Sequence, residues 1–176
     1  MVEGERDDQR GERLATSAEQ WVLLSYRVPR EPSTARIAIW RKLKRCGAAQ
    51  LGDGLVALPA DARTREQFDW LAEEVVQAGG TAGVWLARPV TAAQERALAQ
   101  RMADARAEEY SALTTGAEQA LTSTGAERAR ALRRLRGQWR EITRRDFFPP
   151  PQRGAAEAAL RELSAAAQER GQAVGP

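Results

Sequence analysis

The residues in this sequence that could do chemistry are mostly basic, and they gather in two blocks. Residues 21–47 carry seven Lys or Arg against one acid, and residues 128–153 carry nine basic residues against two acids. In the rest of the chain acids outnumber bases, so the net charge of +3 conceals two strongly positive segments. Cationic groups at this density attract phosphates and displace the counterions of a polyanion. The pattern therefore predicts binding to nucleic acid.

The two blocks have different compositions and different simpler interpretations. The first block is a solvated helix face in the simpler interpretation, but one acid against seven bases argues for binding. It consists of Arg27, Arg30, Arg36, Arg41, Lys42, Lys44 and Arg45. The second block contains arginine and no lysine, which suits bidentate contacts. A simpler interpretation explains the arginine content equally well: codons rich in G and C favour arginine, and these arginines pair with acids of a neighbouring helix. From this block, which also includes Arg128, Arg130 and Arg145, we expect DNA contacts from Arg133, Arg134, Arg136, Arg140 and Arg144.

Composition excludes several classes of site. The chain has no histidine and one cysteine, so Ser-His-Asp and Cys-His arrangements, histidine-based metal sites and intramolecular disulfides are ruled out. No pair of acids stands out for general acid–base work. We therefore expect no catalysis, no metal site and no required cofactor. The sequence lacks an apolar run of membrane-spanning length and a signal-peptide core, which predicts no membrane contact and a cytoplasmic protein.

Apolar runs, caps and turn residues predict an α+β chain. Each element from residue 21 to residue 88 has its own start and stop signals, including a capping box at Thr64 and Gln67 and an Asp53-Gly54 hairpin turn. The order is β-α-β-β-α-β, which is typical of a ferredoxin-like antiparallel sheet with both helices on one face. The expected elements are strands at 21–28, 48–51, 55–58 and 81–87, with helices at 33–46 and from 64 to Gly79.

We expect three segments: a disordered arm at residues 1–20, the ferredoxin-like domain at 21–90, and a helical extension at 91–170 packing on that domain or on a second subunit. Within the extension we expect a helix over 91–113, a loop over 114–125 with a short helix around Ala120 as an alternative, an arginine-rich helix and a last helix over 155–169. The apolar seam Leu132, Leu135, Trp139 and Ile142 and the exposed strand edges are candidate surfaces for a homodimer.

Two further residue types invite a functional interpretation. Trp40 and Trp139 could stack on bases, although their helical spacings favour positions in the core. Cys46 lies beside Lys44 and Arg45, which could lower the pKa of its thiol, but a small buried hydrophobe at a helix end is the more common case.

Two motifs carry a resemblance to a known family. Residues 21–33, Trp-Val-Leu-Leu-Ser-Tyr-Arg-Val-Pro-Arg-Glu-Pro-Ser, with Ile39-Trp-Arg-Lys-Leu-Lys-Arg-Cys-Gly-Ala and Leu58-Pro59, resemble the N-terminal domain of the ChrB chromate-resistance regulators. Arg145-Asp-Phe-Phe-Pro resembles the second hallmark of that domain. The first motif is also similar to the middle domain of phenylacetate-operon repressors and to the CRISPR nuclease Cas2. Arg27 stands where Cas2 has a metal-binding Asp, so nuclease activity is not expected here.

The resemblance implies a regulator that binds promoter DNA of a chromate-efflux operon and releases it when chromate is present. ChrB proteins continue into a second domain after the second motif, which implies a separate chromate-sensing domain. With no winged helix ahead of Trp21, DNA contact must come from the two basic blocks. The alternative is an anion- or protein-binding subunit of a split regulator, in which the arginines hold chromate or sulfate as effector or an acidic protein surface.

Overall fold

The computed structural model describes residues 20–31 and 33–172, with side chains described as far as residue 168. The expected arm at residues 1–20 lies outside these residues apart from Gln20. The described chain is of the α+β class and divides into two compact units, of which the first ends at Met102 and the second begins at Ala103.

The first unit is built on a four-stranded antiparallel sheet. Its strands are β1 (Trp21–Arg27), β2 (Ala49–Gly52), β3 (Leu55–Pro59) and β4 (Thr81–Ala87). They lie in the order β2-β3-β1-β4, so the strand richest in large apolar residues is central, between β3 and β4. Val22 and Leu24 of β1 are fully buried, as expected for the middle of a sheet.

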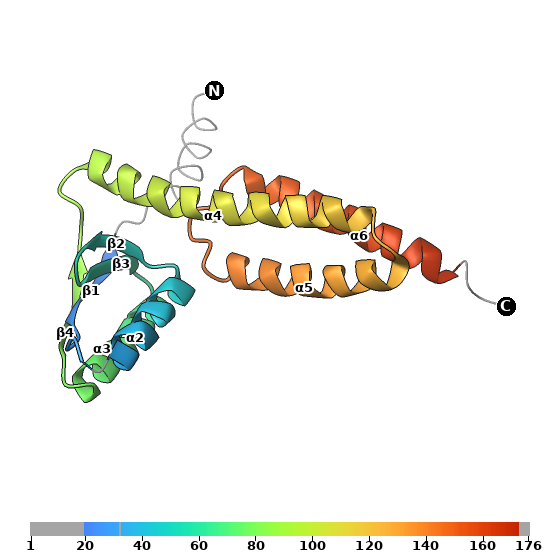
Figure 1. Ribbon diagram of the computed structural model, residues 1–176. Helices are drawn as coiled ribbons and strands as arrows, with labels where there is room; N and C mark the ends of the chain where they lie inside the picture. The colour runs from blue at the N-terminus through green and yellow to red at the C-terminus, as the bar shows by residue number, and fades with distance from the viewer. Residues whose placement is uncertain (1–19, 32, 173–176) are drawn as a thin grey trace, which may run out of the picture. The chain divides into compact units, whose positions relative to one another are not determined.

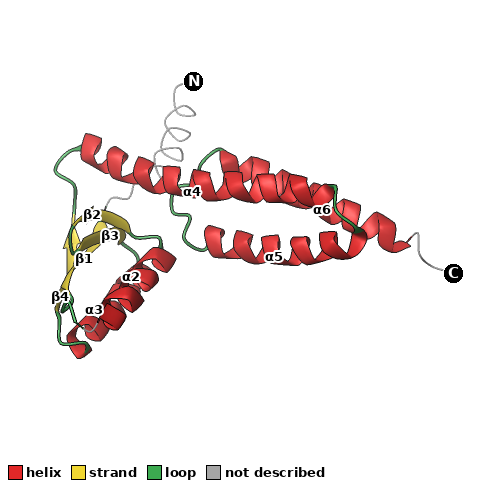
Figure 2. Cartoon of the chain, viewed as in Figure 1, coloured by secondary structure: helices red, strands yellow, loops and turns green. Residues whose placement is uncertain are grey.

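Two helices, α2 (Ser33–Cys46) and α3 (Ala62–Gln77), cover one face of this sheet (Figures 1 and 2). Ile39 and Leu43 of α2 and Phe68 of α3 fill the core between the layers. Gly47 ends α2 at a φ of +74°, where its N–H bonds to the Lys44 carbonyl. Glycine adopts such a left-handed conformation without steric cost, which is why helices so often stop there.

The start of α3 differs from the sequence prediction. The capping box uses Asp61 and Thr64, because the Asp61 carboxylate accepts from the Thr64 N–H at 2.7 Å and the Thr64 hydroxyl accepts from the Asp61 N–H at 3.0 Å. The predicted box at Thr64 and Gln67 was therefore wrong by one turn. Thr64 also donates to the Pro59 carbonyl at 2.6 Å, which ties the helix start to the end of β3.

Three long helices follow: α4 (Ala92–Leu121), α5 (Gly125–Thr143) and α6 (Gln152–Gln172). The predicted loop over residues 114–125 was wrong for residues 114–121, because α4 continues to Leu121 and only residues 122–124 separate it from α5. Ala117 and Ala120 in that stretch are buried in the core of the second unit. Tertiary packing thus overrides the weak helix preference of the Thr and Gly residues there.

The apolar seam of α5 is used inside the chain. Leu132, Leu135 and Ile142 belong to the buried core of the second unit, together with Leu160 and Leu163 of α6. Trp139 packs against the same core, as predicted, with its ring centroid 5.4 Å from that of Tyr110. The seam is therefore not a free dimer surface, because the chain's own helices already bury it.

Candidate nucleic-acid interface

The first basic block falls at two places in its unit. Arg41, Lys44 and Arg45 lie on the last two turns of α2, and all three are exposed. Arg27 ends β1 and Arg30 follows in the loop before α2, so both lie at the opposite end of that helix. Since an α-helix rises about 1.5 Å per residue, roughly 15 Å separates the two groups along α2. Arg36 is exposed one turn into the helix. The block is one charged region in sequence but two clusters in space.

Lys42 has a partner within the protein. Its ammonium forms an ion pair with Glu74 of α3, which links the two helices across the same face of the sheet. Both side chains remain more than a third exposed, at 37% and 39%, so this pair contributes little to stability. It does reduce the charge that Lys42 presents, which makes this lysine the weakest candidate in the block.

Trp40 lies on the surface of α2 and not in the core, which corrects the prediction. Its side chain is 50% exposed, and the Lys44 ammonium lies 4.4 Å from the centroid of its ring. The helical spacing that suggested a core position is shared by Ile39 and Leu43, and these two are the residues of α2 that are buried. Trp40 and Lys44 form a cation–π pair at a solvated surface.

The arginines of α5 lie on different sides of the helix. Arg130, Arg133, Arg140 and Arg144 recur at intervals of three, seven and four residues, which places them on one exposed face over about 21 Å. Among the described residues, no carboxylate forms an ion pair with Arg130, Arg133 or Arg140. We call these four residues the α5 arginine face. Three of them were predicted contacts, and Arg130 is an addition from the structure.

Arg128 lies inside the second unit. It is 3% exposed, and its guanidinium donates to main-chain carbonyls of Leu121 at 2.7 Å, Ser123 at 2.9 Å and Ala166 at 3.1 Å, with a longer bond to Ala120. These carbonyls belong to the C-terminal end of α4, the following turn and α6. Arg128 therefore caps α4 and joins it to α6, although the sequence places it in a basic block.

Two more arginines of the second block have partners. Arg136 donates to the Ser164 hydroxyl of α6 at 2.8 Å, although its side chain remains exposed. Arg145 holds Glu109 of α4 in a bidentate pair at 2.7 and 3.1 Å, and Arg106 bonds the same carboxylate at 2.8 Å. Pairing with acids of a neighbouring helix, the simpler interpretation of the block, is thus correct for Arg145.

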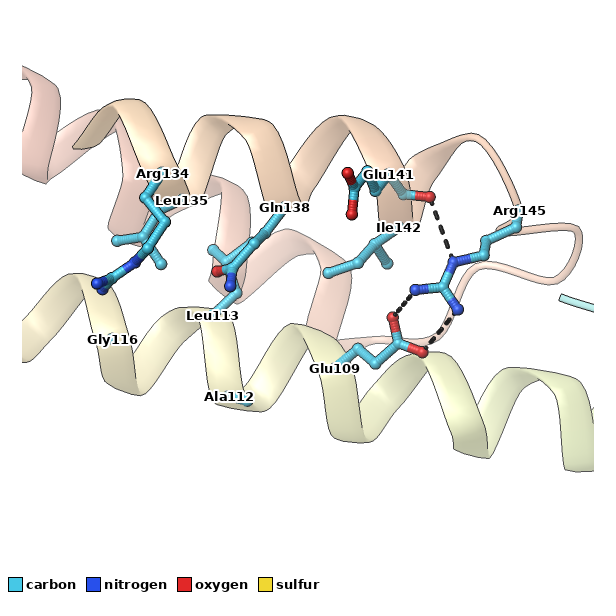
Figure 3. Close-up of a pocket in the computed structure, with 10 residues that line it drawn as sticks. All are labelled: Glu109, Ala112, Leu113, Gly116, Arg134, Leu135, Gln138, Glu141, Ile142 and Arg145. Carbon is cyan, nitrogen blue, oxygen red and sulfur yellow. Dashed lines mark hydrogen bonds and ion pairs between the residues drawn. The ribbon is translucent and has the colours of Figure 1, made fainter. Parts of the chain in front are cut away.

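A pocket of about 420 Å³ lies between α4 and α5 within the second unit (Figure 3). Leu113, Leu135 and Ile142 line its apolar part, and the Glu109–Arg145 pair closes one end. Arg134 lies at the other end, apart from that pair. A tetrahedral dianion is held by two or three convergent cations. With Arg145 bound to Glu109, the pocket does not present such a set.

The second family motif is a structural junction. Asp146 has a fully buried side chain and accepts a hydrogen bond from the Tyr110 hydroxyl at 2.8 Å, with Arg153 at 3.4 Å. Burial, and then the bond to Asp146, raise the Tyr110 pKa well above its ordinary value. Burial also lowers the pKa of Arg106, although Glu109 opposes that effect. Arg145 and Asp146 thus connect α4 to the segment between α5 and α6.

Cys46 is half-buried at the end of α2. Burial raises the pKa of its thiol, and the opposing fields of Arg45 and Arg63 are smaller. A reactive low-pKa thiol is therefore not what the structure provides. Within the described part of the chain, no three His, Cys, Asp or Glu residues gather as metal ligands. No helix there is long and apolar enough to cross a membrane.

Comparison with known proteins identifies the family. The alignment with Protein ChrB of Cupriavidus metallidurans extends over 150 residues at 31% identity and covers 83% of this chain. It covers 46% of that protein, so the chain spans about half the length of the curated relative it matches. Residues 36–174, which include most of α2 and all of the later elements described above, match the family described as Protein ChrB, N-terminal. On these matches, the chain belongs to the ChrB N-terminal family.

Proposed function

We propose that this chain is the DNA-binding part of a transcriptional regulator of a chromate-resistance operon, which leaves its promoter when chromate is present. Family membership supports the regulatory role. The first unit serves as a ferredoxin-like scaffold, since its element order is β-α-β-β-α-β with β1 central. Such a regulator acts in the cytoplasm, where the promoter is, and a homodimer would match a palindromic operator.

The α5 arginine face is the observation that carries the DNA-binding proposal. Four exposed guanidinium groups on one side of a helix, over about 21 Å, face a stretch of B-DNA that carries about twelve phosphates. Gly137 lies in the middle of the same face, so no side chain there hinders a close approach. The cations at the C-terminal end of α2 (Arg41, Lys44 and Arg45) form a second contact surface of the same chemistry. Lys42, Arg136 and Arg134 are secondary candidates.

The proposal is tested by the salt dependence of binding to the chain's own upstream DNA. Six neutralised phosphates give a slope of log K against log salt of about −5, and each lost contact makes that slope shallower by about 0.9. The double variant Arg133→Ala with Arg140→Ala should therefore shift the slope by nearly two. Arg161→Ala is the matched control, because Arg161 of α6 belongs to neither contact surface and its charge is already paired with Glu157. Affinity for all sequences should fall together, as expected for phosphate contacts.

Two results would contradict the proposal. One is an affinity that changes little between about 50 and 300 mM salt, since backbone contacts on a polyanion cannot be insensitive to salt. The other is a double variant with the same slope as the Arg161 control. Titration calorimetry with chromate then distinguishes the alternative function. Micromolar binding of chromate by this chain, without any shift of promoter DNA, would support an anion-binding subunit in place of a DNA-binding one.

A further inference from the structure

The open face of the sheet carries a tryptophan that is exposed and yet fixed in place. Trp85 of β4 is 60% exposed, although its indole N–H donates to the Ser25 hydroxyl of β1 at 3.1 Å. Ser25 in turn donates to the Gly83 carbonyl at 3.3 Å. Exposed side chains ordinarily move between rotamers. Here two consecutive hydrogen bonds hold the indole in one orientation.

Gly83 leaves room for the indole to pack close against the sheet. A Cβ at this position would come within 3.0 Å of the indole nitrogen and 3.3 Å of its Cε2 atom, so the ring occupies the space above the glycine. The ring therefore lies close against Gly83, and Trp85 is nonetheless 60% exposed, so much of the indole is open to solvent. Leu23 lies directly across the ladder from Trp85 and is half-buried, so the floor around the ring is apolar.

A cation lies on the neighbouring strand β1, beyond the serine that holds this ring. Arg27 follows Ser25 by two residues, so both side chains project from the same face of β1 about 7 Å apart. Arg27 is exposed, and no carboxylate among the described residues forms an ion pair with it. A flat aromatic surface with an uncommitted guanidinium at its side matches the two parts of a nucleotide, its base and its phosphate.

We propose that Trp85 is a stacking site for an unpaired base of single-stranded nucleic acid, with Arg27 on the adjoining phosphate. The charge of Arg27 favours this occupant over an apolar peptide or a second copy of the chain. Pre-orientation of the indole lowers the entropy lost on binding. The site differs from the phosphate contacts proposed above, because base pairs in an intact duplex do not offer a free face. This inference rests on the proposed function in one respect, namely that the ligand is a nucleic acid.

The test compares a twelve-nucleotide oligo(dT) with an abasic strand of the same length and charge, at fixed salt. Stacking on one aromatic side chain contributes enough that Trp85→Leu should weaken oligo(dT) binding about 5- to 100-fold. Binding of the abasic strand should not change. Trp70→Leu is the matched control, since Trp70 is 61% exposed on α3 and its substitution should leave oligo(dT) affinity unchanged. Quenching of tryptophan fluorescence by oligo(dT) should be smaller in the Trp85 variant only.

Ser25→Ala provides a second variant that keeps the ring. It removes the acceptor that orients the indole, so oligo(dT) affinity should fall by less than in Trp85→Leu, and circular dichroism should remain native. Equal loss in the Trp70 and Trp85 variants, or equal loss for oligo(dT) and the abasic strand, would overturn the inference. Salt-dependent duplex binding that survives Trp85→Leu belongs to the proposed function. The two proposals can therefore fail separately.

Discussion

Arg128 provides the sharpest test of the tertiary structure, because sequence and structure assign it opposite roles. Its guanidinium is buried and bonds to main-chain carbonyls at the end of α4, in the next turn and in α6. Arg128→Met keeps the aliphatic stem and the helix preference and removes only the charged donors. The variant therefore isolates the contribution of these hydrogen bonds to the stability of the second unit.

The expected loss follows from the bonds themselves. Three of the four are 3.1 Å or shorter, and the fourth, to Ala120, is 3.4 Å. At about 1 to 1.5 kcal/mol net for each short bond, the loss is about 4 kcal/mol. That is a large share of the roughly 5–15 kcal/mol by which domains are stable. With about 2–4 °C per kcal/mol for a chain of this size, the midpoint of thermal unfolding should fall by about 12 °C.

Hydrogen exchange measured by mass spectrometry resolves the effect by unit, which a single melting curve does not. Protection should fall in α5, α6 and the C-terminal half of α4, while β1 to β4 keep their wild-type rates. Arg130→Met is the matched control, since Arg130 is exposed two residues away and has no ion pair among the described residues. An Arg128→Met protein as stable as this control would refute the assignment of Arg128 to the core.

Two further predictions concern the other unusual positions. Stability should decline as the pH rises above about 10, because an unfolded tyrosine ionises there while the raised pKa of folded Tyr110 keeps it neutral. Tyr110→Phe should flatten that decline in urea titrations at several pH values, and an unchanged slope would contradict it. Gly54→Ala should destabilise the first unit by more than about 1 kcal/mol, since Gly54 has a φ of +72° and an added Cβ would lie 2.3 Å from the Tyr26 carbonyl oxygen. Gly52→Ala, with nothing within 4 Å, should show a smaller loss.

Much of the first unit follows from local sequence. The apolar run at residues 21–28 predicts β1, Asp53-Gly54 predicts the turn between β2 and β3, and Gly47 and Gly79 predict the ends of α2 and α3. These signals are local because they depend on main-chain conformation and on alternation within a few residues. Strand alternation would also have placed Trp85 on the open face, had it been applied to β4.

The helical region was harder to predict, for two physical reasons. Thr114, Thr115 and Gly116 have weak helix preference, and the helix continues through them because Ala117 and Ala120 pack into a core that includes residues of α5 and α6. Trp40 shares the spacing of its buried neighbours, and only the placement of α2 on the sheet shows which side faces solvent. Neither the extent of α4 nor the exposure of Trp40 can be predicted from the sequence of one helix alone, because both depend on contacts with other elements.

The sequence by itself determined the class of the chain, the order of its elements, the absence of histidine chemistry and the presence of two basic blocks. Only the tertiary structure decided which arginines remain available. Arg128 is used to cap a helix and Arg145 to hold Glu109, whereas Arg133 and Arg140 face outward. The reason is that positive charge is a property of a residue type, while its availability depends on which carbonyls and carboxylates the fold brings within hydrogen-bond distance.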